Sequence, residues 1–334
     1  PISAWNKRQV GCCYQKSNDF KKALKFYKSA EELEPLNIWC LTNIAWCSVK
    51  LNDNLTAQNY YEKVYEMAPD DAVNNRLFGH FLINQNKYEL ALQYLLKSHQ
   101  TLPSHTGALA HIALCYENLN DYQTAILYLQ KSLELDPLSE LTNMHYGYCL
   151  NELKQHLEAL PYYLKAFEIN PKYHYNVKQL GIVNINLSNF ENALKYFKLA
   201  YEIDKEANFP SVLTQIALCN YKLGNEKEYL EAIEKVTLSK TVNRFRLLAW
   251  FYYEIGEFKL SQENFELCKQ NGIFEDFGGY ADLQLASGNN DEAIEYYKKV
   301  IAKGVYFKNF ILKDYLILKE KYKKELNILE ACLQ

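Results

Sequence analysis

The stretch AWNKRQVGCCYQKSNDFKKALKFYKSAEELEPLN, residues 4–37, contains the pattern that decides the fold of this chain. An apolar stripe at helical spacing comes first, followed by the turn pair Asn18-Asp19, a second stripe and Pro35. Asn tolerates the left-handed backbone that ends a helix, and Pro stops one helix or starts the next. The stretch therefore predicts a helix, a tight turn and a second helix. The two stripes consist of Ala4, Val10, Gly11 and Tyr14, and of Ala23, Leu24, Tyr27 and Ala30.

The same pattern returns every 34 residues, in three separate columns of the sequence. The columns hold Pro35, Pro69, Pro103, Pro137 and Pro171; Ala23, Ala57, Ala91, Ala125, Ala159 and Ala193; and the small residues Gly11, Ala45, Gly79, Ala113, Gly147 and Gly181. A fixed period of this length predicts a repeat protein in which each hairpin completes its core against its neighbours.

The period divides most of the chain into units. Residues 4–207 are expected to hold six regular units, and residues 208–307 three degenerate ones with a loosened period. Residues 308–334 are expected to form a C-terminal cap of one or two helices. The regular units are 4–37, 38–71, 72–105, 106–139, 140–173 and 174–207.

The residues of one unit also resemble a known family. The fifth unit reads Tyr146, Gly147, Ala159, Tyr163, Ala166 and Pro171 at the spacings of the tetratricopeptide repeat (TPR). The resemblance implies an all-α fold, a right-handed α-solenoid, or superhelix, of tandem helix-turn-helix hairpins. About nine repeats and a C-terminal capping helix are expected.

Composition excludes several classes of function. The net charge of −3 from 37 basic and 40 acidic residues argues against nucleic acid as a partner. No apolar run reaches the roughly 20 residues that span a bilayer. Phosphate-binding loops, catalytic elbows and paired metal-ligand motifs are lacking, so the sequence predicts no enzyme, no cofactor and no metal. The nine cysteines form no Cys-x-x-Cys pair, and five of them recur at one position of the first helix. They are expected to be free, buried thiols in a cytoplasmic protein.

Candidate binding residues follow from the resemblance, which implies that the first helices line a concave groove. All four tryptophans and three of the four arginines fall on the inward positions, including Trp5. Trp and Arg are the residue types most enriched in binding hot spots. The predicted peptide-binding groove consists of Arg8, Trp39, Asn43, Trp46, Arg76, His80, His111, His145, Tyr148, Lys178, Arg246 and Trp250.

The leading functional prediction is a protein–protein interaction scaffold that binds an acidic and apolar peptide or protein segment in this groove. The basic clamp that captures acidic chaperone tails in the family is incomplete, because Cys12, Val73 and Leu77 replace expected clamp residues. Two alternatives stay open. The array is a structural or regulatory arm of a larger multidomain protein, as the missing cap before residue 4 suggests, or a module that forms a homodimer through the solenoid ends.

Overall fold

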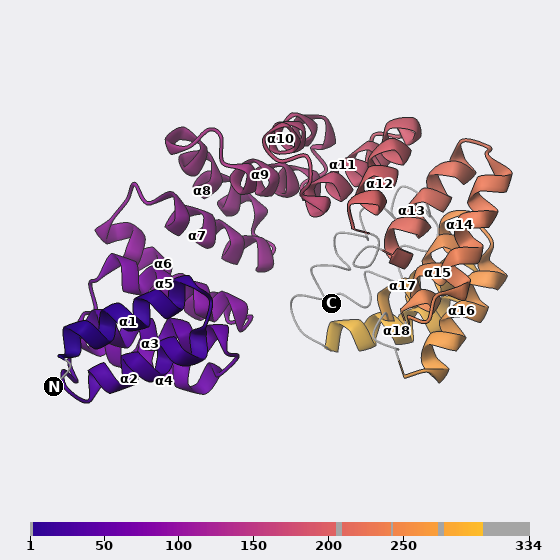
Figure 1. The fold of residues 1–334 in the computed structure, drawn as a ribbon. Helices are drawn as coiled ribbons and strands as arrows, with labels where there is room; N and C mark the ends of the chain where they lie inside the picture. The colour runs from indigo at the N-terminus through magenta and orange to yellow at the C-terminus, as the bar shows by residue number, and fades with distance from the viewer. Residues whose placement is uncertain (1–2, 205–208, 242, 273–276, 303–334) are drawn as a thin grey trace. The chain divides into compact units, whose positions relative to one another are not determined.

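The computed structural model describes residues 3–204, 209–241, 243–272 and 277–302 (Figure 1). Within these ranges the chain forms eighteen α-helices and no strand, and consecutive helices form antiparallel pairs. The all-α solenoid of TPR hairpins predicted from the repeat is therefore confirmed. The predicted cap at 308–334 lies outside the described residues.

Each regular unit contains one hairpin, and the first helix of each begins close to the start of the unit. The twelve helices of the regular units are α1 (Ala4–Lys16), α2 (Phe20–Glu31), α3 (Ile38–Lys50), α4 (Asn54–Met67), α5 (Ala72–Asn84), α6 (Tyr88–Thr101), α7 (Thr106–Asn118), α8 (Tyr122–Leu135), α9 (Glu140–Glu152), α10 (His156–Ile169), α11 (His174–Asn186) and α12 (Phe190–Ile203). The six that follow are α13 (Phe209–Lys222), α14 (Glu226–Leu238), α15 (Arg244–Glu254), α16 (Phe258–Gln270), α17 (Phe277–Ala286) and α18 (Asn290–Ala302).

The turn inside each hairpin depends on one residue with a positive φ. In the first hairpin Asn18 has φ 59°, and the Asp19 side chain then accepts a hydrogen bond from the backbone N–H of Lys22 as the cap of α2. Asn or Gly occupies this position in most hairpins, as expected for the left-handed region. Lys154 and Ser188 take it in the fifth and sixth hairpins, with φ of 65° and 58°. Neither residue type indicates a left-handed turn. At these two sites the turn is located by the repeat period and not by the residue itself.

Small residues let the two helices of a hairpin approach closely. A Cβ built on Gly181 in α11 would lie 2.6 Å from the Phe197 ring of α12, and one built on Gly11 would lie 2.7 Å from the Tyr27 ring. These distances are shorter than real carbon contacts, so the aromatic ring occupies the space that a side chain would need. The small-residue column of the sequence is therefore a packing requirement.

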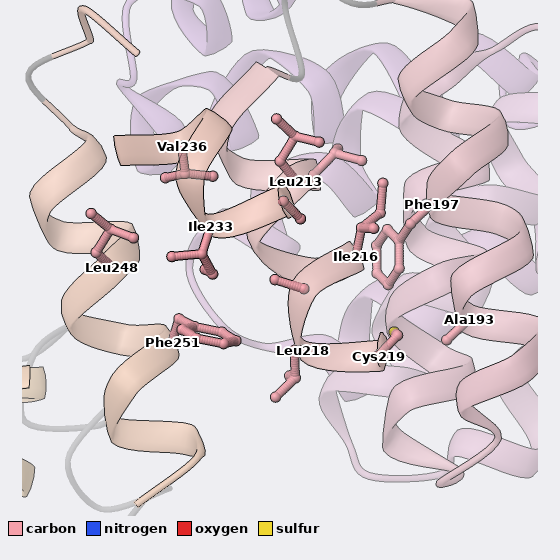
Figure 2. Packing of buried hydrophobic residues seen from close by; sticks show 13 residues of the cluster. Ala193, Phe197, Leu213, Ile216, Leu218, Cys219, Ile233, Val236, Leu248 and Phe251 are labelled. Atoms are coloured by element: carbon pink, nitrogen blue, oxygen red, sulfur yellow. The ribbon is translucent and has the colours of Figure 1, made fainter. Parts of the chain in front are cut away.

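The described chain divides into two compact units, residues 1–149 and 150–334. In the second, Phe197 is fully buried with Val212 and Cys219 of the next hairpin (Figure 2). In the first, Tyr61 and Phe78 pack together between neighbouring hairpins, with ring centroids 5.4 Å apart. The core therefore runs between hairpins, as a repeat protein requires.

The column of recurring cysteines is buried as predicted at Cys47, Cys115, Cys149 and Cys219, but Cys13 is exposed. Cys47, on α3, packs against α2 of the first hairpin. Cys13 holds the same position on α1, and no hairpin of the described chain packs on that side of α1. Burial raises the pKa of the Cys47, Cys115 and Cys219 thiols to about 12, which keeps them protonated and unreactive.

No helix of the described ranges has both the length and the apolar character needed to cross a bilayer.

Candidate ligand-binding groove

A cavity of about 670 Å³ opens between the first helices of three successive hairpins, all within the compact unit 1–149. This is the size range of sites that hold small molecules or individual side chains of a larger ligand. It brings together three of the predicted groove residues, Trp39, Asn43 and Trp46. The remaining lining residues are Gln15 of α1, Ile38 and Thr42 of α3, Asp71 before α5, and Val73, Asn74 and Leu77 of α5.

Trp39 presents a large apolar surface to this cavity. Its side chain is 46% exposed, and its indole meets the buried Tyr27 ring edge-on at 5.7 Å between centroids. Asn43 lies one turn further along α3, and its Nδ2 donates to the backbone carbonyl of Trp39 at 2.7 Å. A tryptophan held on one side and open on the other provides contact area at little entropic cost.

Trp46 lies deeper and is held from two directions. Its indole packs edge-on against Phe20 at 5.3 Å, and the Lys50 ammonium lies over the ring at 5.3 Å from the centroid. Trp46 is also packed against the buried cluster around Tyr27 and Cys47. It therefore contributes to hairpin packing as well as to the cavity wall.

Polar groups of α3 and α5 complete the cavity. The Thr42 hydroxyl lies 2.8 Å from Asn74 Oδ1, and the Asp71 carboxylate caps α5 by accepting from the Asn74 backbone N–H at 2.8 Å. Such fixed amide and hydroxyl groups among apolar walls orient a ligand and give specificity.

The two predicted arginines of this unit differ in their surroundings. Arg8 forms an ion pair with Glu34, so its charge is already matched within the protein. Arg76 on α5 is partly buried, and its buried Nε makes no hydrogen bond to another protein atom. Of the two, Arg76 is the one whose guanidinium retains donors for a ligand.

Two predicted histidines stack beside Arg76. The rings of His80 on α5 and His111 on α7 lie 4.6 Å apart at an interplanar angle of 10°. Burial lowers the pKa of His80, and the charges of Arg76 and Lys50 lower it further. Burial also lowers the pKa of His111, to about 3, with contributions from His80, Arg76 and His105. Both imidazoles are therefore neutral near pH 7 in the unliganded chain.

His145 and Tyr148, on α9, are engaged with other side chains. His145 Nδ1 lies 2.8 Å from a carboxylate oxygen of the buried Glu117, whose other oxygen accepts from the Cys149 thiol at 3.5 Å. The Tyr148 ring packs edge-on against Tyr122 at 6.2 Å. Their contacts are those of hairpin packing.

The other three predicted residues belong to the compact unit 150–334. Burial lowers the pKa of Lys178 on α11. Trp250 on α15 packs against the core shown in Figure 2, and the exposed Arg246 donates from Nε to Asn243 Oδ1 at 2.8 Å. None of these three residues lines the cavity between α1, α3 and α5.

Several residues of the groove were missed from the sequence. Gln15 falls on an inward position of its unit but was not among the residues singled out there, and Asp71 and His105 stand at the N-cap positions of α5 and α7. The cap position of the unit gives a signal for His105, because the equivalent residues Asn37 and Asp71 are types that cap helices well and histidine is not. Tyr173, at the same position before α11, departs from the pattern in the same way. Within the described residues, no group of three His, Cys, Asp or Glu side chains is placed to hold a metal ion.

The lowered pKa of His111 predicts a pH dependence of stability. The unfolded chain binds a proton near pH 6.5, whereas the folded chain resists protonation down to about pH 3, so His111 favours the folded state above pH 6.5. Its contribution is lost as the pH falls from 6.5 to 3, with a slope of at most about 1.4 kcal/mol per pH unit. Urea unfolding of His111→Phe across this range should show a shallower fall in the free energy of unfolding than wild type. Identical slopes would contradict the assignment.

Comparison with known proteins agrees with the repeat geometry. A tetratricopeptide-repeat family model matches residues 9–35, 142–173, 179–206 and 278–302, and the model of anaphase-promoting complex, cyclosome, subunit 3 matches residues 52–132. No curated protein matches the chain in sequence.

The chain is also similar to solved structures. The Cut9–Hcn1 structure of the APC/C is 18% identical with a TM-score of 0.57, over 79% of this chain and 52% of that one. PilF of Pseudomonas aeruginosa is 19% identical with a TM-score of 0.50, over 64% and 97%. MamA from Desulfovibrio magneticus RS-1 is 22% identical with a TM-score of 0.45, over 50% and 92%.

Antiparallel helix pairs at a 34-residue period define a helical-repeat protein of the protein-interaction class. More specifically, the chain belongs to the tetratricopeptide-repeat family. Members of this family are typically non-catalytic scaffolds that bind other proteins.

Proposed function

We propose that the chain captures an extended peptide segment of a partner protein across its first four hairpins. The apolar side chain of the segment enters the cavity between Trp39 and Trp46, and an acidic side chain pairs with Arg76. The single observation that carries this proposal is the open cavity with the half-exposed Trp39 on its wall.

Basic groups near the cavity support an acidic ligand over a basic one. The one charged residue among those lining the cavity is Asp71, and its carboxylate is engaged as the cap of α5. Arg76 lies next to Leu77, a residue of the cavity wall, and Lys50 lies over the Trp46 ring. Arg8 is engaged with Glu34, so it is not assigned a ligand contact.

A selection from a random peptide library displayed on phage tests the proposal. Peptides enriched on wild-type chain should share an apolar, preferentially aromatic, residue and an acidic residue. They should fail to enrich on the Trp46→Ala and Arg76→Glu variants, whose helical content is checked by circular dichroism. Enrichment of the same peptides on wild type and on both folded variants would contradict the groove assignment.

A further inference from the structure

The first helices of the third and fourth hairpins bring four basic side chains together. Arg76 and His80 lie on α5, His105 precedes α7, and His111 lies on α7. His80 stacks on His111, and the Arg76 side chain lies against Gly107 at the start of α7. All lie in the compact unit 1–149. Lys50, whose ammonium lies over the Trp46 ring, is close enough to His80 to lower the pKa of that imidazole.

Two features of the sequence make room for this cluster. The second position of the unit is Trp5 and Trp39 in the first two hairpins but Gly107 in the fourth. A Cβ at Gly107 would lie 3.0 Å from His105 Cε1 and 3.8 Å from Arg76 Cδ. His105 occupies the cap position of α7 yet makes no side-chain capping bond. The glycine thus leaves space that the two basic side chains occupy, and α7 begins without a side-chain cap.

The cluster is costly for the unliganded protein. Arg76 Nε, His105 Nδ1 and His111 Nδ1 are buried and make no hydrogen bond to another protein atom. Burying a polar group without a hydrogen-bond partner costs free energy, and a cation without a counter-charge costs more. Every charged or titratable group that shifts the two stacked imidazoles is itself basic, namely Arg76, Lys50, His105 and the neighbouring histidine. An anion placed here would pair with the Arg76 charge and accept hydrogen bonds from donors that make none within the protein.

We propose that Arg76, His80, His105 and His111 form a proton-coupled oxyanion site, which binds a carboxylate or phosphate monoester group carried by the peptide ligand of the groove. The proposal rests on the proposed function only in taking the anion to be part of the bound peptide. Arg76 supplies a fixed positive charge and several N–H donors. A histidine becomes a second cation when the anion arrives, because an opposite charge at close range favours the protonated ring.

Proton uptake makes the site sensitive to pH. In the free chain burial, Arg76, Lys50 and His105 hold the stacked imidazoles neutral. A bound oxyanion opposes these effects, so binding takes up protons from solution. Anion affinity is therefore expected to increase as the pH falls toward the raised pKa of the histidine in the anion-bound chain.

Histidine NMR of the full chain tests the site with inorganic phosphate and acetate as probes. The ring signals of His80 and His111 are assigned with the variants His80→Gln and His111→Gln. Phosphate should raise the midpoint of the His80 or His111 titration by about one pH unit or more. Acetate producing the same shift would identify a carboxylate site, and a shift with phosphate alone would identify a phosphate monoester site.

Arg76→Gln gives two effects of opposite sign. Without phosphate, the titration midpoints of His80 and His111 should rise, because a repelling charge is removed. With phosphate, the further shift seen in wild type should be lost. Arg246→Gln is the matched control, since Arg246 occupies the same repeat position, is exposed and lies in the other compact unit.

Two outcomes would overturn the proposal. The first is that neither phosphate nor acetate shifts the titration midpoint of His80 or His111. The second is an equal response of the His156 ring signals in the other compact unit, which would mean an adventitious ion only. Because the probes are small anions, the result is independent of the peptide selection. If phosphate or acetate binds but the library yields no peptide whose enrichment depends on Trp46 and Arg76, the proposed function is wrong and the anion site stands.

Discussion

Trp39→Ala is expected to weaken binding of a library-selected peptide by about 2 kcal/mol or more, which is roughly 30-fold in Kd at 25 °C. The indole lies on the cavity wall with nearly half of its surface open, so a ligand would bury that surface. Truncation to alanine removes this apolar surface from the cavity wall. Isothermal titration calorimetry with the selected peptide measures the loss.

Trp5→Ala is the matched control for this variant. Trp5 is also a tryptophan at the second position of its unit, is 60% exposed, and does not line the cavity. It should leave peptide affinity unchanged. If the two alanine variants bind the peptide equally well, the cavity is not where the peptide is held. Circular dichroism should report wild-type helical content for both, because neither indole is buried.

Phe197→Ala is expected to destabilise the compact unit 150–334 by about 3–5 kcal/mol. The ring is fully buried, with Gly181 of its own hairpin on one side and Ile216 and Cys219 of the next hairpin on the other (Figure 2). Its removal opens a cavity at the junction of two hairpins, and both lose contacts. Chemical denaturation should show a lower transition midpoint for this variant.

Leu157→Ala provides the comparison for Phe197→Ala. Leu157 is an apolar residue of the same compact unit but is 76% exposed. Its truncation should change the free energy of unfolding by no more than about 0.5 kcal/mol. A loss at Phe197 no greater than that at Leu157 would mean that the hairpins do not share this core. Binding of the selected peptide should be unaffected by Leu157→Ala.

Much of the fold could be predicted from the sequence because each turn and helix signal occurs several times at a fixed interval. Asn18 alone is a weak turn signal, but Asn52, Asn86 and Asn120 repeat it at the same interval. The interval itself then locates the turns at Lys154 and Ser188, whose residue types give no such signal.

The groove was less predictable, because side-chain partners depend on contacts between hairpins. The inward position of Arg8 and Arg76 is the same, yet only Arg8 has a carboxylate within reach, that of Glu34. His105 was missed because it stands at a capping position, where the repeat pattern expects a residue turned toward the backbone.

Within each compact unit of the described chain, each hairpin packs chiefly on the hairpins directly before and after it. Duplicating or deleting a block of 34 residues leaves every remaining hairpin with the same kind of neighbour. Such a chain can grow or shrink over evolutionary time by unequal recombination while keeping a single folding rule. Local unfolding has local effects for the same reason. A hairpin that unfolds removes packing contacts only from the hairpins that touch it.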